Sequence, residues 1–274
     1  DVAVGFGGYV SGPVVRTAAK MGIKTAIHEQ NAYPGVTNKA LAKKADKVML
    51  TVEAAKEHLS CPTPPIVTGL PVRREIVSAN RDFARAELHV PDDAVMILSM
   101  GGSLGAKAIN EAMTALIAAR YTDKNLFFLH ATGKYGKWVP EKLRENGVDS
   151  EKTSNVVIRE YIDNMDVCLA AADLVIGRAG ASSLSEIEAT GKASVLIPSP
   201  NVAENHQYHN AMALVNQDAA KIIEEKDLTP ERLIAVVDSL TQDKSALRTL
   251  GENAKKMAVM DSAAVICDIL TELA

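Results

Sequence analysis

The chain has 274 residues, which is room for one large domain or two ordinary ones, and its 47% hydrophobic and 23% charged residues are typical of a globular protein. This composition excludes a disordered or fibrous chain, and the net charge of -4 argues against a nucleic-acid binder, which needs a concentrated basic surface. The three cysteines, Cys61, Cys168 and Cys267, lie too far apart for a disulfide framework and favour a reducing cytoplasm. No apolar run reaches the roughly 18 residues of a spanning helix.

The chain opens directly into an apolar run, 2–4, with Asp1 in place of a Met, so we expect a fragment or a processed piece. Four glycines follow in Gly5–Gly12, a turn whose N–H groups could hold an anion or simply pack backbone closely. Pro13 predicts the first position of a helix that stops before Gly22.

The polar stretch His28–Asn31 follows the next strand, 24–27, at the end where parallel sheets bind ligands. Glu29 is a candidate base and Asn31 a candidate hydrogen-bonding group. A plain polar loop is the simpler interpretation of the same residues.

Strand and helix patterns alternate along the rest of the chain, which predicts a doubly wound parallel sheet in each half. Pro71 makes the crossing 69–74 extended, and we place a domain boundary there. Further strands are expected at 47–50, 66–68, 94–100, 126–129, 156–158, 173–176, 193–197 and 220–223. Helices are expected at 37–45, 53–58, 79–88, 109–119, 140–146, 165–171, 182–190, from about 204, at 229–240 and over 247–273.

A second glycine turn, 101–106, joins a buried strand to a helix. Its G-x-S-x-G pattern matches a hydrolase nucleophile elbow, for which Asp173 and His206 or His209 could complete a triad in the right order. There is no HGGG-type oxyanion loop upstream, and a hydrolase leaves a later serine cluster unexplained. We therefore interpret Ser103 as a hydroxyl donor to a diphosphate.

That serine cluster lies within the densest polar stretch, 173–211, where a strand, a glycine turn and a helix follow one another. Ser183 and Glu186 have the spacing of a capping box at the helix start. A second helix begins at the polar run 204–208, so two helix N-termini face one sheet edge and favour a phosphate. A ribose could then bind the Glu186 carboxylate.

Glu204, His206 and His209 could also be taken as part of a zinc site, but a zinc site needs a further ligand and an arranged second shell. We therefore expect no protein-bound metal. No DxD triplet occurs in the chain, which agrees with a diphosphate held by helix ends.

Seven stretches, taken in this order, resemble the MurG family of bacterial glycosyltransferases over nearly the whole chain. They are GFGGYVSGP (5–13), HEQNAYPGVTNK (28–39), GLPVR (69–73), GGSLGAKAIN (101–110), EYIDNM (160–165), GRAGASSLSEI (177–187) and NHQYHNA (205–211). The resemblance implies a GT-B fold, in which two Rossmann-like domains with parallel sheets face one another across a cleft. The implied domains are 1–71, a truncated amino-terminal acceptor domain, 72–252, a UDP-sugar domain, and 253–274, a last helix that returns to the first.

The resemblance also implies an inverting transfer of N-acetylglucosamine from UDP-N-acetylglucosamine to undecaprenyl-diphosphate-linked N-acetylmuramyl-pentapeptide. No cofactor is permanently bound, and the enzyme would lie on the inner face of the bacterial plasma membrane.

Residue by residue, the resemblance assigns the donor sugar nucleotide to both halves of the chain. Asn31 and Arg73 would contact it, Ser103 would bind its diphosphate, the backbone of Ile162 would read uracil, and Gln207 would hold sugar hydroxyls. The run Ala181, Ser182, Ser183, Leu184, Ser185 and Glu186 would hold the diphosphate, the sugar and, through Glu186, the ribose. Gly7, Gly8, Tyr9 and Ser11 would lie on the acceptor side.

The chain departs from the family pattern at its start, where a full member has a further strand and a glycine turn with a histidine. We expect this missing part to carry the main base candidate, which leaves Glu29 as the carboxylate base within the chain, and we expect weakened or absent turnover. Three alternatives stay open: a UDP-sugar epimerase of the same shape, a serine hydrolase at Ser103, and a non-catalytic module that complements a separate polypeptide.

Overall fold

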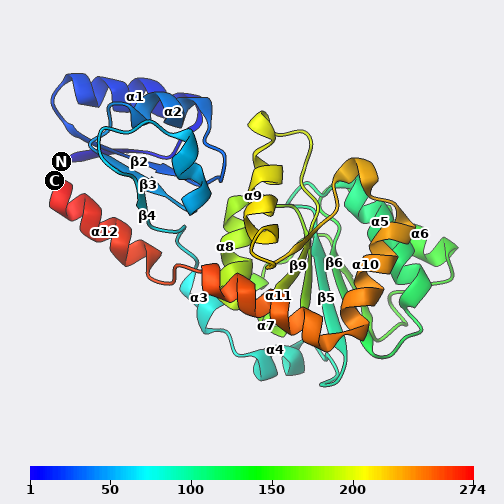
Figure 1. The fold of residues 1–274 in the computed structure, drawn as a ribbon. Coiled ribbons are helices and arrows are strands. Elements are labelled where there is room, and N and C mark those ends of the chain that lie inside the picture. Colours follow the sequence, from blue (N-terminus) through cyan, green and yellow to red (C-terminus); the bar gives the residue numbers. More distant parts are fainter.

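A computed structural model describes residues 1–274 as two lobes, each built on one parallel sheet (Figure 1). The N lobe (1–68 with the last helix) has four strands in the order β1-β2-β3-β4, and the C lobe (74–257) has six in the order β10-β9-β8-β5-β6-β7. All strand pairs are parallel. The predicted α/β class with a parallel sheet in each half is confirmed.

Alternating residues of the N-lobe strands face two different helical layers, as the period of a strand requires. Ile27 and Val48 pack beneath α1 and α2, whereas Ala26 and Met49 pack against α12. The N-lobe elements are β1 (Val2–Gly5), α1 (Gly8–Lys20), β2 (Lys24–Glu29), α2 (Val36–Ala42), β3 (Lys47–Leu50), the 3-10 helix η1 (Glu53–His58) and β4 (Ile66–Val67).

Two large apolar clusters cover the faces of the C-lobe sheet, with Met96 and Leu98 of β5 on one and Ile97 on the other. Its strands are β5 (Val95–Met100), β6 (Leu126–Ala131), β7 (Val156–Arg159), β8 (Leu174–Gly177), β9 (Ala193–Leu196) and β10 (Lys221–Ile222). Its α-helices are α3 (Arg74–Ser78), α4 (Arg81–Glu87), α5 (Lys107–Arg120), α6 (Val139–Glu145), α7 (Met165–Ala171), α8 (Ala181–Thr190), α9 (His206–Val215), α10 (Pro230–Gln242) and α11 (Lys244–Met257). Two 3-10 helices, η2 (Ala203–Asn205) and η3 (Glu225–Asp227), complete it.

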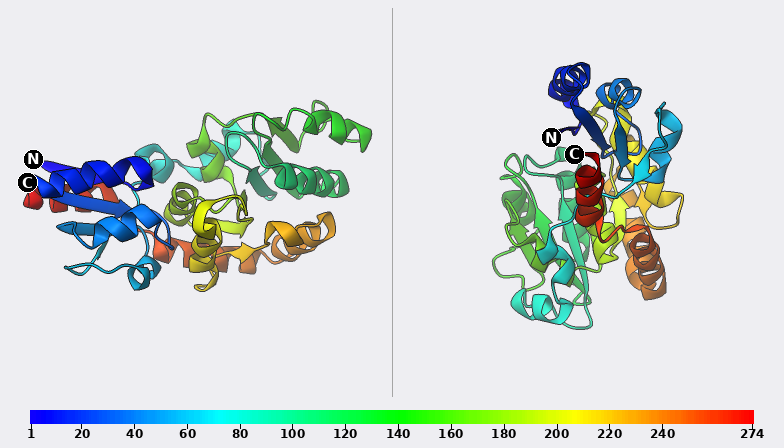
Figure 2. Two further views of the ribbon diagram at one scale, coloured as in Figure 1. Left: turned by 90° about the horizontal axis from the view of Figure 1, so that it is seen from above. Right: turned by 90° about the vertical axis from the view of Figure 1, so that its left-hand side faces the viewer.

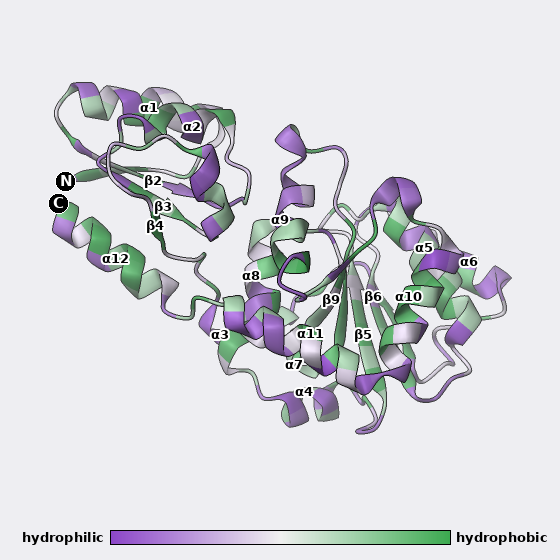
Figure 3. Ribbon diagram, viewed as in Figure 1, coloured by the Kyte–Doolittle hydropathy of each residue, from purple (hydrophilic) through white to green (hydrophobic).

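The chain crosses between the lobes twice, and the crossings touch. A side chain at Gly69 (φ +69°) would meet Val259 and Ser262, so only glycine fits where the outward crossing passes the returning one. Beyond it α12 (Ser262–Leu273) packs on the N-lobe sheet through apolar residues, coloured green in Figure 3. The two termini therefore lie side by side in every view (Figures 1 and 2).

Several expected boundaries move. Helix α1 begins at Gly8, not at Pro13, because Gly7 (φ +87°) makes the turn, and Pro13 lies inside the helix. The predicted helix over 247–273 breaks at Ala258, so residues 253–257 belong to α11 and the returning segment starts after Met257. No helix has both the length and the apolar character needed to span a bilayer.

Candidate active site

Three loops leave the same edge of the C-lobe sheet. Met100, Ala131 and Gly177 lie in register at the carboxyl ends of β5, β6 and β8. The Ser103 loop, the 132–136 loop and the start of α8 therefore leave from neighbouring strands, at the edge where parallel sheets bind ligands.

The Ser103 loop, 101–106, rests on the 132–136 loop. The Ser103 carbonyl accepts a hydrogen bond from the Lys134 N–H at 3.1 Å, and the Leu104 carbonyl accepts one from the Tyr135 N–H at 3.0 Å. At Gly105 (φ +83°) an added Cβ would lie 2.1 Å from the Thr132 carbonyl oxygen. The Ser103 side chain is exposed, so the loop holds its hydroxyl toward solvent on a fixed backbone.

Helix α8 begins one turn earlier than the capping-box pattern requires. Its N-cap is Gly180, without a side-chain hydrogen bond, and Ser183 is already the third helical residue. The predicted capping box is therefore wrong, because Ser183 and Glu186 lie inside the helix. The Glu186 carboxylate instead lies 3.9 Å from the Arg73 guanidinium of the outward crossing. Burial raises the pKa of Glu186 and the Arg73 charge opposes that shift.

The side chains in the first turns of α8 face different surroundings. Ser182 is exposed, and Ala181 and Ser183 are half-buried. Leu184 packs into the C-lobe core, and Ser185 is buried beside N-lobe residue Thr51. Ile162, in the loop after β7, is 5% exposed.

On the N-lobe rim, Gly7 and Gly8 (φ +72°) form the turn between β1 and α1. The Ser11 hydroxyl donates to the Gly7 carbonyl at 2.6 Å, which fixes this turn from within the helix. Tyr9 is 89% exposed.

Glu29 is 2% exposed, and both its oxygens accept hydrogen bonds. One oxygen accepts from the backbone N–H (2.9 Å) and side-chain amide (3.2 Å) of Asn31. The other accepts from the Asn38 amide (2.8 Å) and the Gly35 N–H (3.2 Å). The four donors occupy both carboxylate oxygens and hold the side chain in one position. Glu29 ties down the loop that carries Asn31.

Asn210 of α9 joins this loop to the C lobe. Its Oδ1 accepts from the Ala32 N–H at 2.8 Å, and its amide donates to Asn31 Oδ1 (3.0 Å) and to the Ala179 carbonyl (3.1 Å). Sequence reasoning missed Asn38 and Asn210 as partners, although both lie inside the quoted motifs. The Asn210 partner Asn31 is 179 residues away and the Asn38 partner Glu29 is 9 residues away, so neither pairing follows the period of a single helix or strand.

A cavity of about 390 Å³ lies between the lobes. Gly7, Gly8, Glu29 and Asn31 line it from the N lobe, and the C lobe adds Ala203, Glu204 and His206. Gln207 is not on its wall, and its Oε1 accepts the Ser199 N–H at 2.9 Å. His206 Nδ1 bonds to the Ala203 carbonyl at 2.9 Å, and no three His, Cys, Asp or Glu side chains gather in a metal-binding arrangement.

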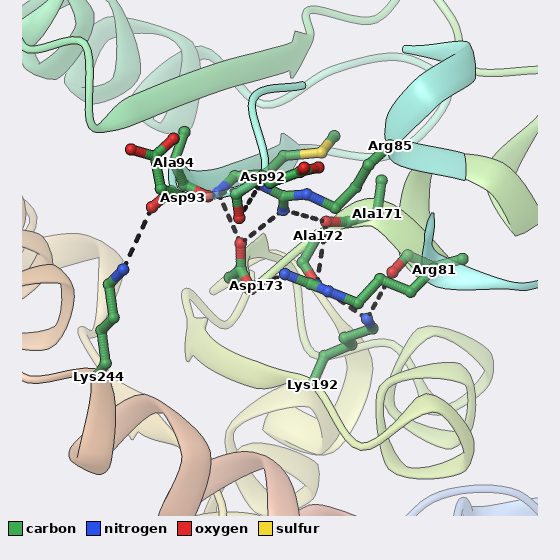
Figure 4. Close-up of polar contacts among 12 residues, drawn as sticks. Arg81, Arg85, Asp92, Asp93, Ala94, Ala171, Ala172, Asp173, Lys192 and Lys244 are labelled. Atoms are coloured by element: carbon green, nitrogen blue, oxygen red, sulfur yellow. Dashed lines mark hydrogen bonds and ion pairs between the residues drawn. The ribbon is translucent and has the colours of Figure 1, made fainter. Parts of the chain in front are cut away.

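The hydrolase triad is wrong, because its acid lies at the other end of the sheet. Asp173 precedes β8 at the level of Met96, whereas Ser103 follows Met100 at the opposite end of β5, so four strand residues separate the two levels by about 13 Å at roughly 3.3 Å each. Asp173 accepts from Arg81 (2.7 Å), Arg85 (3.1 Å) and the Met96 N–H (2.8 Å), as Figure 4 shows for the arginines.

A larger cavity, about 640 Å³, lies at that amino-terminal edge. Its cations bind carbonyls at helix ends: the Lys192 ammonium donates to Ala170 and Ala172 at the end of α7, both at 2.9 Å. These bonds complement the negative pole at the end of α7.

Comparisons with known proteins agree with this geometry. Residues 96–266 match the glycosyltransferase family 28 C-terminal domain, and residues 1–50 match the corresponding N-terminal domain. A relative from Desulforamulus reducens is 43% identical over 94% of this chain and 69% of its own length. One from Bacillus cereus is 42% identical over 100% of this chain and 74% of its own. Both are named UDP-N-acetylglucosamine--N-acetylmuramyl-(pentapeptide) pyrophosphoryl-undecaprenol N-acetylglucosamine transferase.

Among solved structures, Acinetobacter baumannii MurG superposes with a TM-score of 0.81 at 30% identity, over 99% of this chain and 73% of that one. A UDP-GlcNAc 2-epimerase from Neisseria meningitidis gives a TM-score of 0.67 at 13% identity, over 99% of this chain and 75% of that one, a likeness of fold alone. The GT-B expectation is confirmed, and the sequence identities favour the transferase over the epimerase. The chain belongs to the MurG family of glycosyltransferases.

Proposed function

We propose that the chain transfers N-acetylglucosamine from UDP-N-acetylglucosamine to undecaprenyl-diphosphate-linked N-acetylmuramyl-pentapeptide, the step from lipid I to lipid II in peptidoglycan synthesis. Family membership supports the donor, the lipid-linked acceptor and the hexosyl transfer. The observation that carries the donor site is Glu186, a half-buried carboxylate at the ligand-binding edge whose one charged partner is 3.9 Å away. Such a carboxylate has lone pairs free for the two vicinal hydroxyls of a ribose.

We infer that the diphosphate lies between Ser103 and the exposed N-terminus of α8. Ser182 and Ser183, together with the unpaired N–H groups of that first turn, supply donors on one side, and the Ser103 hydroxyl supplies one on the other. Backbone groups at Ala181 and Leu184 would contribute without their side chains.

We infer that the remaining contacts to the sugar nucleotide come from the Ile162 backbone, from Arg73 in the crossing between the lobes and from Gln207. Ile162 would read uracil through its backbone, because its side chain is buried. Arg73 would contact the donor from the crossing. The Gln207 Oε1 accepts the Ser199 N–H, which leaves the Nε2 amino group to donate to a sugar hydroxyl, and His206 of the same helix lines the cavity.

The reaction is a single in-line displacement with inversion. The acceptor oxygen bonds to C1 while the C1–O bond to UDP breaks, and the bonding pair leaves with the diphosphate as a base takes the hydroxyl proton. Negative charge grows on the departing diphosphate, so its preorganised donors carry the largest catalytic effect. Removing one such donor costs on the order of 3 kcal/mol in the transition state.

We infer that the acceptor approaches from the side of Gly7, Gly8, Tyr9 and Ser11. We also infer that Glu29 fixes the position of Asn31 and does not act as the base. Peripheral contact with the cytoplasmic face of the plasma membrane follows from the lipid-linked acceptor. Helix α1 supports it with exposed apolar side chains, Tyr9, Val10 and Val14, on a helix that also carries Arg16 and Lys20.

The test measures donor binding and transfer separately. Calorimetry should show that the chain binds UDP-N-acetylglucosamine, and Glu186→Ala should weaken this roughly 10–100-fold, the loss of one charged hydrogen-bonded contact. Glu231→Ala, an exposed change on α10, is the control. Transfer is then followed with labelled donor and lipid-linked acceptor. Binding without transfer would make the chain a donor-binding module, and an affinity that survives Glu186→Ala would remove the ribose assignment.

A further inference from the structure

An aromatic contact bridges the two lobes beside the cleft. The Tyr33 ring of the N-lobe loop stacks on the His209 ring of α9, with centroids 4.8 Å apart and planes 22° from parallel. His58 of η1 packs against the same tyrosine at 4.7 Å, and the Lys39 ammonium lies 3.8 Å from the centre of its ring. One tyrosine thus gathers three nitrogen-bearing side chains at the contact between lobes.

This contact adjoins the polar bridge that holds the Asn31 loop. Tyr33 is two residues after Asn31, and His209 immediately precedes Asn210, which bonds to Asn31 and to the Ala32 N–H. We propose that Tyr33 and His209 are positioning residues whose stack latches the lobes together and holds Asn31 against α9. The contact of the latched Asn31 with the donor sugar nucleotide rests on the function proposed above. The latch itself does not depend on that function.

The charges around the stack make the latch sensitive to pH. Closing the lobes buries His209 and brings Lys39 and His58 near it, and burial, then these two groups, lowers the pKa of His209. Closure therefore releases a proton. The latch is at full strength above the ordinary histidine value of about 6.5 and weakens as the pH falls below it.

Other titratable groups lie on α9 and on the elements packed against it. Glu204 of η2 and His206 of α9 line the same cavity as Tyr33, and the Tyr208 ring meets the His209 ring edge-on at 5.8 Å. Helix α8 and strand β10, which pack on α9, carry Glu186, Glu188 and Lys221. Glu188 matters most, because it lies beside Thr51 and Gly69 at the same interface and burial raises its pKa to about 7. Closure takes up a proton there, which opposes His209, so the histidine effect is measured in the Glu188→Gln background.

The Ala32 amide is a direct reporter of closure, since its N–H is bonded to Asn210 Oδ1 across the lobes. Its hydrogen exchange is measured by NMR from pH 8 to pH 5.5 and corrected for the intrinsic rate. The Thr51 amide, bonded to the Glu29 carbonyl at 2.9 Å within the N lobe, is the internal control for folding. In Glu188→Gln, the protection of Ala32 should fall toward low pH by up to tenfold for each unit by which closure lowers the histidine pKa. Thr51 should not follow.

Four substitutions, each made in the Glu188→Gln background, separate the latch from general stability. His209→Phe keeps an aromatic stack without a titrating ring, so Ala32 should stay protected at all pH values. Tyr33→Phe should behave like the parent. Tyr33→Ala should lower Ala32 protection at pH 8 while Thr51 is unchanged, and His89→Asn, a remote exposed histidine, should change neither amide.

Two results would overturn the latch: Ala32 protection that is unchanged by Tyr33→Ala, or a pH dependence that persists in His209→Phe. Should a variant lose Thr51 protection through misfolding, the pH series in Glu188→Gln alone still decides, because a flat Ala32 profile contradicts the proposal. Binding of UDP-N-acetylglucosamine is recorded in parallel. Its absence with an intact latch would count against the donor function only.

Discussion

The Arg73 guanidinium lies 3.9 Å from the Glu186 carboxylate. The crossing between the lobes therefore touches the C-lobe side chain that we propose binds the ribose. Arg73 is largely exposed and Glu186 is half-buried. The pair is therefore loose enough for a ligand to enter, and a change at the crossing reaches the carboxylate through its charge.

Replacing Arg73 by alanine should make donor binding fail at a higher pH. Burial raises the pKa of Glu186 and Arg73 opposes this shift, so without the arginine the carboxylate takes up its proton earlier as the pH falls. The dissociation constant of UDP-N-acetylglucosamine, measured between pH 4.5 and 8, reports the change. Arg74→Ala removes an adjacent exposed arginine that forms no ion pair with a carboxylate, and identical profiles for the two variants would contradict the coupling.

Glycine 105 should tolerate alanine much less well than Gly102. Both have positive φ, which costs an alanine about 1–2 kcal/mol in each case. Only at Gly105 would the added Cβ meet the Thr132 carbonyl, whereas Gly102 faces open space. Gly105→Ala should lower the free energy of unfolding by about 1–3 kcal/mol more than Gly102→Ala, as overpacking does. Urea unfolding measures this difference. Equal losses of unfolding free energy in the two variants would show that the 101–106 loop and the 132–136 loop do not press together.

Glu29→Gln should affect the free energy of unfolding more directly than it affects the transfer reaction. The amide group would turn a donor toward N–H groups that now donate to the carboxylate, and each unsatisfied buried group costs about 1–3 kcal/mol. Unfolding and transfer are measured together, with exposed Glu53→Gln as the control. A stably folded variant with normal donor affinity and no turnover would instead support Glu29 as the base.

Local sequence patterns predicted most of the helices and strands of the fold. The apolar run ending at Met100 predicted β5 to within one residue, and the period of 165–171 gave α7 with its observed bounds. Five-residue α3 was missed because it follows Pro71 within an extended crossing and is too short to show a period. At Pro13 the sequence rule failed, since a glycine turn six residues earlier starts the helix.

The position of a site residue was predictable from the sequence only where the residue directly follows a strand. Ser103 and Glu186 follow adjacent parallel strands, so placing both at one sheet edge needed only the strand–helix alternation. The bonds of Asn210 to Asn31 and the stacking of His209 on Tyr33 join segments far apart in the chain, and nothing local in either segment encodes the other. The capping-box pattern misled because Gly180, with extended backbone, can end the turn without a side-chain cap.

Glu188→Gln should stabilise the protein at alkaline pH and leave it nearly unchanged at pH 4. Glu188 is 7% exposed, and burial raises its pKa to about 7 from a usual value near 4.3 in the unfolded chain. The folded state therefore binds the proton more tightly. The stability that this gives is complete below about pH 4.3 and is lost as the pH rises through 7, by on the order of 3 kcal/mol. Glutamine keeps the uncharged state at every pH. Urea unfolding of both proteins at pH 4, 6 and 8 should give a difference that grows with pH, and exposed Glu252→Gln should show none. A difference that is constant over this range would mean that Glu188 is charged between the lobes.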